Sequence, residues 1–217
     1  MAVKHLQRLV RDREYKKQHV FYKNAYVENC IPWANGGRAA PFLWKALRKI
    51  KQRLTLKRAL DFGSGEGRNS VAIERCGLKV IGVEYQQKAL KIAQGKGLKN
   101  ILYVRGDIYR IPLKPDSFDV LVDYGVFHHI RRKDTKDYLD LIDSLLVSGG
   151  FYLLSCFASN FKHGNGKVYK RGFVSHKNHY DRFTSKTELK KVFGKSFEIL
   201  EIETDKDRFL HLLARLK

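Results

Sequence analysis

Three alternating glycines are the residues in this chain that are best suited to holding a ligand. Gly63, Gly65 and Gly67 follow the apolar, acid-containing stretch ALDF, and a helix-like segment begins near Arg68. Glycine adopts backbone conformations closed to other residues and has no Cβ atom, so a ligand can approach the main chain closely. The segment predicts a ligand-binding loop between a strand and a helix.

Two phosphate-binding patterns do not fit this loop. The dinucleotide fingerprint G-x-G-x-x-G needs a small residue at its sixth position, which is Arg68 when counted from Gly63. The P-loop needs a GK[ST] sequence, and none follows here. Both phosphate-binding interpretations are therefore weakened.

Two more acidic residues follow expected strands. Glu84 ends the run LKVIGVE, and Asp107 comes directly after NILYVRG. A carboxylate at the end of the second strand can accept hydrogen bonds from both hydroxyls of a ribose. An isolated acid in such a place more often caps a helix or a turn, so the interpretation rests on the joint spacing with the glycine loop.

The sequence Asp61-Phe62-Gly63-Ser64-Gly65-Glu66-Gly67 resembles the first motif of class I S-adenosylmethionine-dependent methyltransferases, which is an acid, one residue and G-x-G-x-G. The resemblance covers residues 58–157 and implies S-adenosyl-L-methionine as the cofactor. It also implies that Glu84 binds the ribose, that Asp107 accepts from the adenine amino group, and that the Ile108 N–H meets the ring. The implied cofactor-binding residues are Asp61, Phe62, Gly63, Ser64, Gly65, Gly67, Glu84, Tyr85, Asp107, Ile108 and Tyr124.

A histidine pair follows the fourth expected strand, in the sequence FDVLVDYGVFHHI. The segment GVFHHI is similar to one in families that methylate small molecules, and it lacks the acid, prolines and aromatic residue typical of enzymes that methylate base amines in DNA. His128 or His129 is a candidate general base for a hydroxyl or thiol acceptor. The alternatives are that one histidine packs under the cofactor while the other caps a helix, and that positioning alone supports methyl transfer.

The upstream segment WANGGRAAPFLWKAL resembles a region of thiopurine-methyltransferase-like and tellurite-resistance-like members of the superfamily. That resemblance implies an N-terminal helix that closes over the cofactor, with Trp33 and Arg38 at its methionine end. The alternative is that Trp33 and Trp44 simply pack against the sheet.

Residues 158–183 are expected to form a long loop. Its part from residue 161 to 183 contains six Lys or Arg, three His and five Phe or Tyr. Long loops are commonly functional lids, and this composition also suits contacts with bases and phosphates. We expect the loop to cover the substrate through His179, Tyr180 and Arg182, with an ordinary surface loop as the alternative.

Short apolar runs alternating with helix-like segments predict the elements that position these residues. The fold class is α/β, Rossmann-like, with a mainly parallel seven-stranded sheet, helices on both faces and an antiparallel C-terminal hairpin. Strands are expected at 58–63, 78–84, 100–106, 118–125, 150–157, 197–204 and 208–216, the last with a short helix as its alternative. Helices are expected at 2–19, 41–54, from 68, at 86–94 and 134–146, and at 185–194, where Ser185 and Glu188 have capping-box spacing.

The chain is expected to be one domain of 217 residues. Residues 1–57 form a basic helical extension that serves as a cofactor lid, and residues 58–217 form the methyltransferase domain. Fifteen Lys or Arg against three acids in residues 1–58 contribute much of the net charge of +21. Such a charge attracts nucleic acid or anionic ligands, and a solvated surface is the alternative.

Cysteine usage and hydropathy indicate the redox state of the thiols, the absence of a membrane span and the expected location of the protein. Cys30, Cys76 and Cys156 are far apart and odd in number, which favours reduced thiols. No run is long and apolar enough for a membrane span, and the charged start is unlike a secretion signal. We expect a cytoplasmic monomer or homodimer with no metal site and no membrane contact.

Three functions are compatible with these residues. The leading one is transfer of a methyl group from S-adenosyl-L-methionine to O, S or N of a small molecule. The second is methylation of tRNA or rRNA, using the basic N-terminal helix and the basic lid. The third is a partner subunit that binds the cofactor without catalysis.

Overall fold

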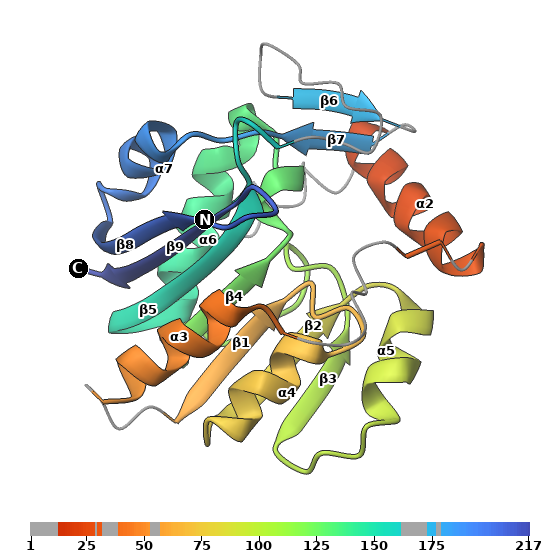
Figure 1. Ribbon diagram of the computed structural model, residues 1–217. Coiled ribbons are helices and arrows are strands. Elements are labelled where there is room, and N and C mark those ends of the chain that lie inside the picture. Colours follow the sequence, from red (N-terminus) through yellow and green to blue (C-terminus); the bar gives the residue numbers. More distant parts are fainter. Residues whose placement is uncertain (1–12, 29, 32–38, 53–56, 162–172, 177–178) are drawn as a thin grey trace.

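The computed structural model describes residues 13–28, 30–31, 39–52, 57–161, 173–176 and 179–217 (Figure 1). Five apolar runs of this part form the parallel strands of a seven-stranded sheet. Their composition fits this position because parallel strands that are covered on both faces carry apolar side chains on both. These strands are β1 (Arg58–Phe62), β2 (Lys79–Glu84), β3 (Ile101–Arg105), β4 (Phe118–Tyr124) and β5 (Leu146–Phe157).

The strand order β3-β2-β1-β4-β5-β9-β8 reverses direction between β1 and β4. Ligands of open α/β sheets bind at the carboxyl ends of the strands beside such a reversal. The register pairs Asp61 with Val122 and Phe62 with Asp123, so two acidic residues lie at the carboxyl ends of the two central strands. The predicted fold class is confirmed, and the topology places the glycine loop at this edge.

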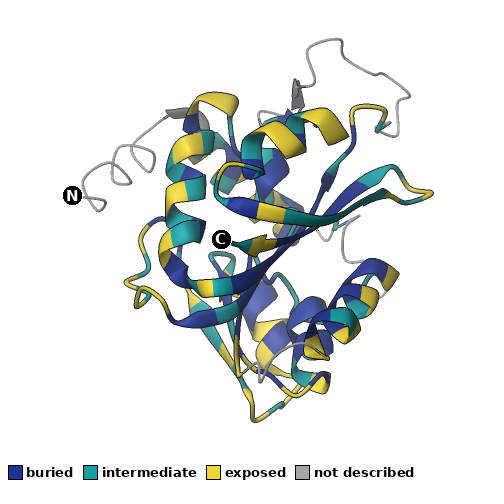
Figure 2. Ribbon diagram, turned by 90° about the vertical axis from the view of Figure 1, so that its left-hand side faces the viewer, coloured by how far each residue is buried: buried dark blue, intermediate teal, exposed yellow. Residues whose placement is uncertain are grey.

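Helices cover the sheet on both faces. Apolar side chains of α3 (Pro41–Lys51) and α4 (Arg68–Arg75) form one buried cluster with one face of the strands, and those of α6 (Thr135–Leu145) and α7 (Lys186–Phe193) form a second cluster on the other face. Figure 2 shows the sheet and the inward sides of these helices as buried. α5 (Gln87–Gln94) lies beside β2 and β3. In α7 the predicted cap is present, since Ser185 Oγ accepts a hydrogen bond from the Glu188 N–H at 3.1 Å.

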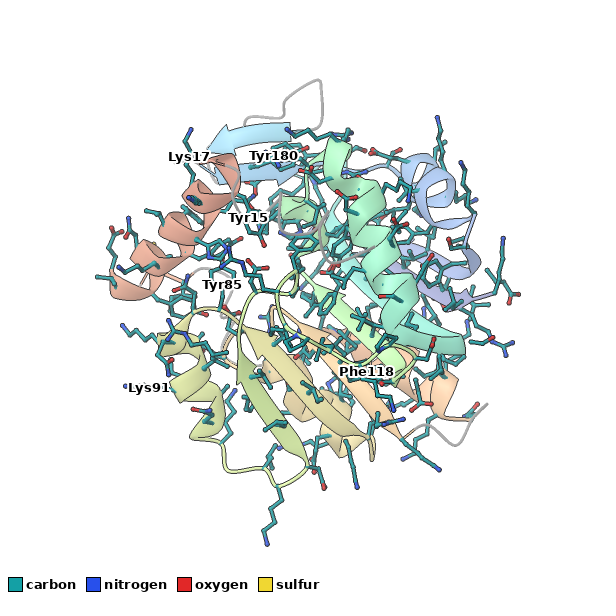
Figure 3. The ribbon with its side chains drawn as sticks, turned by 180° about the vertical axis from the view of Figure 1, so that it is seen from behind. Tyr15, Lys17, Tyr85, Lys91, Phe118 and Tyr180 are labelled. Atoms are coloured by element: carbon teal, nitrogen blue, oxygen red, sulfur yellow. The ribbon has the colours of Figure 1, made fainter. Side chains whose placement is uncertain are left out.

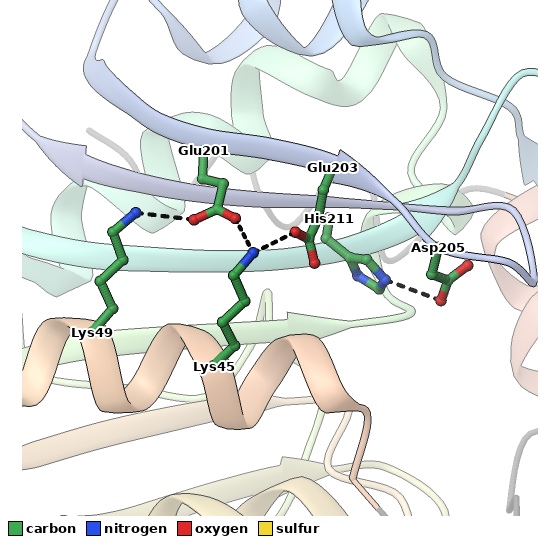
Figure 4. A network of polar contacts seen from close by, with 6 residues as sticks. All are labelled: Lys45, Lys49, Glu201, Glu203, Asp205 and His211. Carbon is green, nitrogen blue, oxygen red and sulfur yellow. Dashed lines mark hydrogen bonds and ion pairs between the residues drawn. The ribbon is translucent and has the colours of Figure 1, made fainter.

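The C-terminal hairpin consists of two strands, β8 (Phe197–Thr204) and β9 (Phe209–Leu216), and β9 pairs antiparallel with β5. The helical alternative for the last segment is therefore wrong. Polar contacts tie this hairpin to α3 (Figure 4): Lys45 contacts Glu201 and Glu203, and Lys49 Nζ lies 3.0 Å from Glu201 Oε2. They bring the end of the chain against the helix that precedes β1.

The described N-terminal helix, α2 (Arg13–Val27), differs from the helix expected over residues 2–19. Residues 1–12 lie outside the described part. The prediction followed aliphatic residues, whereas the buried face of α2 carries Gln18, Ala25 and Tyr26. Aromatic and amide side chains at helical spacing can form the buried face of a helix as aliphatic side chains do. The helical repeat alone decides which residues lie on the same face.

The loop expected over residues 158–183 contains two strands, β6 (Phe173–His176) and β7 (His179–Arg182), which pair antiparallel. These strands are short and polar, so they lack the apolar run that marks a buried strand. Figure 1 shows the pair above the carboxyl edge of the sheet, with α2 packed against β7. β5 also begins four residues before its expected start, since Leu146 already pairs with Phe118.

None of the helices in the described ranges has the length and apolar character needed to cross a bilayer. Within the same ranges, no three His, Cys, Asp or Glu side chains are grouped in a way that could hold a metal ion.

The aromatic cluster beneath the sheet is expected to dominate stability. Phe193 of α7 is fully buried, with ring centroids 5.4 Å from Phe127 and 5.3 Å from Tyr152. Replacing Phe193 with Ala removes this packing and leaves a cavity, so the free energy of unfolding should fall by about 3–5 kcal/mol. Urea unfolding followed by circular dichroism measures the change. Leu102→Ala, at a side chain that is 60% exposed, should stay within about 0.5 kcal/mol and serves as the control.

Candidate functional site

The glycine loop between β1 and α4 requires its glycines. Gly63, Gly65 and Gly67 have φ angles of +60°, +53° and +79°, a region that other residues rarely adopt. A Cβ atom on Gly63 would lie 2.6 Å from Val126 Cγ2, and one on Gly67 would lie 2.1 Å from the Tyr103 hydroxyl. The backbone at Gly63 and Gly67 therefore lies too close to Val126, after β4, and to Tyr103 of β3 to leave room for a side chain.

Two acidic side chains, those of Asp61 and Glu84, lie beside this loop. Asp61 is fully buried and accepts from Ser70 Oγ at 2.5 Å; burial raises the pKa of Asp61 to about 7 despite that hydrogen bond. Glu84 accepts from the N–H of Gly65 at 3.1 Å and of Gln86 at 2.8 Å, and burial raises the pKa of its carboxyl. The Glu84 side chain thus ties the loop to β2.

Asp107 lies beyond the end of β3 and receives hydrogen bonds from several donors. Its Oδ1 accepts from the Tyr109 N–H at 2.9 Å and from the Tyr15 hydroxyl at 3.0 Å. Burial opposes ionisation of Asp107, but the hydrogen bonds from His19, Tyr109 and Tyr15 outweigh it and lower the pKa of this carboxyl. Asp107 is therefore held as a carboxylate.

Helix α2 covers Asp107 and approaches Glu84 with side chains that the sequence did not predict to be part of the site. His19 stacks on Tyr85, with ring centroids 4.1 Å apart and planes at 25°, and its Nε2 lies 3.3 Å from Asp107 Oδ2. Figure 3 shows Tyr15 and Tyr85 between this helix and the carboxyl edge of the sheet. Tyr15, His19 and Tyr22 are spaced four and three residues apart, so a search for polar aromatic residues at helical spacing would have found them.

The two histidines after β4 have different surroundings. His128 is buried and stacks on Phe157, with ring centroids 3.7 Å apart. His129 contacts the Tyr22 hydroxyl through Nε2, and its Nδ1 lies 3.1 Å from the Tyr180 carbonyl oxygen and 3.0 Å from Asp181 Oδ1. Of the two, only His129 has a ring nitrogen directed at a hydroxyl group among the contacts described.

Asp123 at the end of β4 fixes the turn that carries these histidines. Its buried carboxylate accepts from the N–H of Val126 at 2.7 Å and of Phe127 at 3.0 Å, and from the hydroxyls of Tyr138 and Tyr152. Burial raises the pKa of Asp123, and these hydrogen bonds oppose the rise. The sequence offered one signal for this role, an acid placed before a short 3₁₀ turn, Phe127–His129.

The side chains of several other predicted site residues pack within the protein. Phe62 and Ile108 belong to the hydrophobic core. Tyr124 lies 5.3 Å below the Arg68 guanidinium, facing Phe209. The half-buried Trp44 packs against the core under α3, in line with the alternative for that residue.

The predicted substrate residues of β7 are engaged in the fold. Tyr180 accepts a hydrogen bond from Gln18 through its carbonyl oxygen. Arg182 is buried, contacts Glu188 at 2.7 Å and Thr135 at 2.8 Å, and lies 4.4 Å from the Phe127 ring centre. Because its donors bind these partners, a structural role is favoured for Arg182. Trp33, Arg38 and the side chain of His179 lie outside the described part.

The donor set fits an adenosyl amino acid. Among the described residues, Asp61 Oδ1 and Ser64 Oγ are buried without a hydrogen-bond partner beside the glycine loop. Burying such atoms without a hydrogen-bond partner costs free energy, and a ligand that supplies the partner would remove this cost. A small cavity of about 20 Å³ lies between α2 and β7, lined in part by Tyr15, Gln18 and His129, and has room for little more than water.

Comparisons with known proteins agree with this geometry. Residues 60–154 match the family described as Methyltransferase domain. An uncharacterized methyltransferase of Alkaliphilus oremlandii is 33% identical over 105 residues, covering 48% of this chain and 46% of that protein, and one of Bacillus pumilus is 31% identical over 91 residues, covering 42% of each. The chain thus spans less than half the length of these relatives.

Among solved structures, a Burkholderia thailandensis 1,6-didemethyltoxoflavin-N1-methyltransferase with bound S-adenosylhomocysteine superposes with a TM-score of 0.74 and 20% identity, over 93% of this chain and 88% of that one. This likeness shows the shared fold. The fold is Rossmann-like, with a mainly parallel seven-stranded sheet and an antiparallel C-terminal hairpin. Residues 60–154 of the chain are thus similar to methyltransferase domains, both in sequence and in fold.

The Asp123 network is expected to be essential for folding. Asp123→Ala leaves two backbone N–H groups and two buried phenols without their acceptor, so the free energy of unfolding should fall by more than about 3 kcal/mol. Tyr152→Phe removes one donor and should cost about 1 kcal/mol. Chemical denaturation of both variants measures the difference, and equal losses would contradict the central role of the carboxylate.

Proposed function

We propose that this protein is an S-adenosylmethionine-dependent methyltransferase that transfers a methyl group to O, S or N of a small molecule. The convergence of the glycine loop, Glu84 and Asp107 at one edge of the sheet is the observation that carries the proposal. The relatives, all named as methyltransferases, support the same activity.

Each residue has a proposed task toward the cofactor. Asp61, with Ser64, would complement the ammonium group of the methionine part, and Glu84 would accept from the ribose hydroxyls. Asp107 would accept from the adenine amino group, and Tyr85 would stack on the ring. When bound, the cofactor supplies a methyl group on a positively charged sulfur, and the protein contributes by holding an acceptor in line with it and by excluding water.

We further propose that α2 is a lid over this site. His19 already stacks on Tyr85 and pairs with Asp107, and Tyr15 donates to the same carboxylate. These are the groups assigned to adenine, so α2 must withdraw for the cofactor to enter and can then close over it. This proposal assigns to α2 the lid role that the resemblance of the upstream segment implies for the N-terminal extension.

A small acceptor is supported by the cover that α2 and β7 form over the carboxyl edge, where Gln18 Nε2 donates to the carbonyl oxygens of His129 and Tyr180. The Burkholderia thailandensis methyltransferase of similar fold has 1,6-didemethyltoxoflavin bound together with S-adenosylhomocysteine. RNA methylation and a non-catalytic partner role remain predictions from charge and from the cofactor site alone.

Isothermal titration calorimetry with S-adenosylmethionine tests the proposed cofactor. The wild-type chain is expected to bind one equivalent. Asp107→Asn should weaken binding by at least about tenfold, because one oxygen that accepts from adenine becomes an amide donor. Asp207→Asn, at an exposed turn residue of the same charge, should bind like the wild type. An absence of heat with the folded wild-type chain would reject the function.

The lid makes a separate prediction. His19→Ala removes the ring that competes for Tyr85 and Asp107, so the apparent affinity for S-adenosylmethionine should rise about three- to tenfold. Val20→Ala, one residue further on the same helix at a 56% exposed position, should leave the affinity unchanged. Weaker binding by His19→Ala would instead make His19 a ligand of the cofactor.

A further inference from the structure

The arrangement of Tyr22, His129 and Asp181 extends the proposed function, on which this inference rests. We propose that Asp181 positions His129 as the base for a hydroxyl acceptor, an aryl alcohol, and that the Tyr22 side chain holds the acceptor's place until α2 withdraws. The three side chains come from α2, the turn after β4, and β7, so only the folded chain brings them together.

The contacts of His129 are those expected when the neutral ring carries its proton on Nδ1. Nδ1 faces two acceptors, the Tyr180 carbonyl oxygen at 3.1 Å and Asp181 Oδ1 at 3.0 Å. A nitrogen placed between two acceptors must itself be a donor, so the neutral ring has its proton on Nδ1. Nε2 is then left with its lone pair directed at the Tyr22 hydroxyl, which donates to it.

Asp181 is suited to this task because it is buried, with 1% of its surface exposed. A carboxylate in such a place stabilises the positive charge that His129 acquires when it takes a proton, since the low local dielectric strengthens the attraction. The hydrogen bonds from Gln18 to the carbonyl oxygens of His129 and Tyr180 hold the turn and β7 in register. Asp181 therefore acts as a positioning residue through His129.

The chemical class of the acceptor is inferred from the phenol of Tyr22, which contacts His129 Nε2 in this structure. Tyr22 places a phenol there, and its ring has edge contacts with His129 and Tyr85 at centroid distances of 5.3 Å and 6.2 Å. Burial, with the charges of Asp181 and Glu84 nearby, raises the pKa of the Tyr22 phenol well above its ordinary value. An aryl alcohol in the same place would also stay protonated, so it would need a base before it could act as a nucleophile.

The reaction balances with these groups. The acceptor's oxygen–hydrogen bond breaks and its proton passes to His129 Nε2, while the oxygen forms a bond to the methyl carbon as the sulfur–methyl bond breaks. The sulfur keeps the electron pair of the broken bond, and S-adenosylhomocysteine leaves uncharged. His129, now positively charged beside Asp181, then releases the proton to water.

The test begins with a matched panel of small acceptors. Catechol and phenol are compared with thiophenol and aniline by the release of S-adenosylhomocysteine, under conditions in which calorimetry shows that S-adenosylmethionine binds. We expect turnover of at least one aryl alcohol and none of aniline. Cofactor binding without turnover of either alcohol, or turnover of aniline alone, would overturn the inference and leave the cofactor site intact. Failure to bind the cofactor would instead reject the proposed function.

Variants then separate positioning from simple folding. Asp181→Asn should lower kcat for the aryl alcohol about tenfold to a hundredfold with KM changed by less than about twofold, and Asp181→Glu should recover part of the loss. Tyr22→Phe removes the competing hydroxyl, so KM for the alcohol should fall while kcat is kept. An unchanged kcat in Asp181→Asn, or a lost kcat in Tyr22→Phe, contradicts the assignment.

A measurement on the protein without ligands completes the test. Long-range ¹H–¹⁵N spectra at pH 8, assigned with His129→Gln, should show the His129 proton on Nδ1 in the wild type. In Tyr22→Phe the Nε2 resonance should move toward that of a nitrogen without a hydrogen bond. A proton on Nε2 in the wild type would rule out His129 as the base, whatever the activities are.

Discussion

Burial of carboxylates at one edge of the sheet is the constraint on which the rest of this structure depends. Asp61, Glu84 and Asp123 lie at the carboxyl ends of parallel strands, Asp107 follows another, and all four are buried. A buried carboxylate is costly unless donors satisfy it. The neighbouring elements accordingly direct donors toward this edge.

The hydrogen-bond donors to these acids come from different parts of the protein. This difference distinguishes the acid that stabilises the fold from the acid that is proposed to bind the cofactor. Asp123 receives backbone N–H groups and phenols from the core, so its contacts are permanent parts of the fold. Asp107 receives two of its donors from α2, which packs on the site from outside the sheet. Contacts of the second kind can be exchanged for those of a ligand, and they are the ones proposed to give way to the cofactor.

Helix α2 consequently has two functions in the proposed mechanism. Its side chains satisfy buried acceptors before ligands arrive, and they exclude water from the site. The His19 side chain occupies the position proposed for the adenine, and the Tyr22 side chain occupies that proposed for the acceptor. A single movement of the helix would therefore make both positions accessible. Once α2 closes again over the bound ligands, the site would exclude water that competes for the cavity.

The sequence by itself determined the strands of the sheet, the order of the elements along the chain and the glycine loop. These features depend on local signals: apolar runs long enough for buried strands, glycines that need positive φ, and acids that directly follow strands. The Ser185 cap and the C-terminal hairpin were predictable for the same reason.

Tertiary structure alone decided the neighbours of His129 and the use of α2. Asp181 is 52 residues after His129 in the chain, and Tyr22 is 107 residues before it, so no local pattern relates the three. The partners of Arg182 were likewise not visible in the sequence. Its charged, aromatic-rich segment suggested a substrate contact, whereas in the structure its guanidinium contacts Glu188 and Thr135. Contacts between distant segments depend on how the elements pack, and packing is a property of the whole chain.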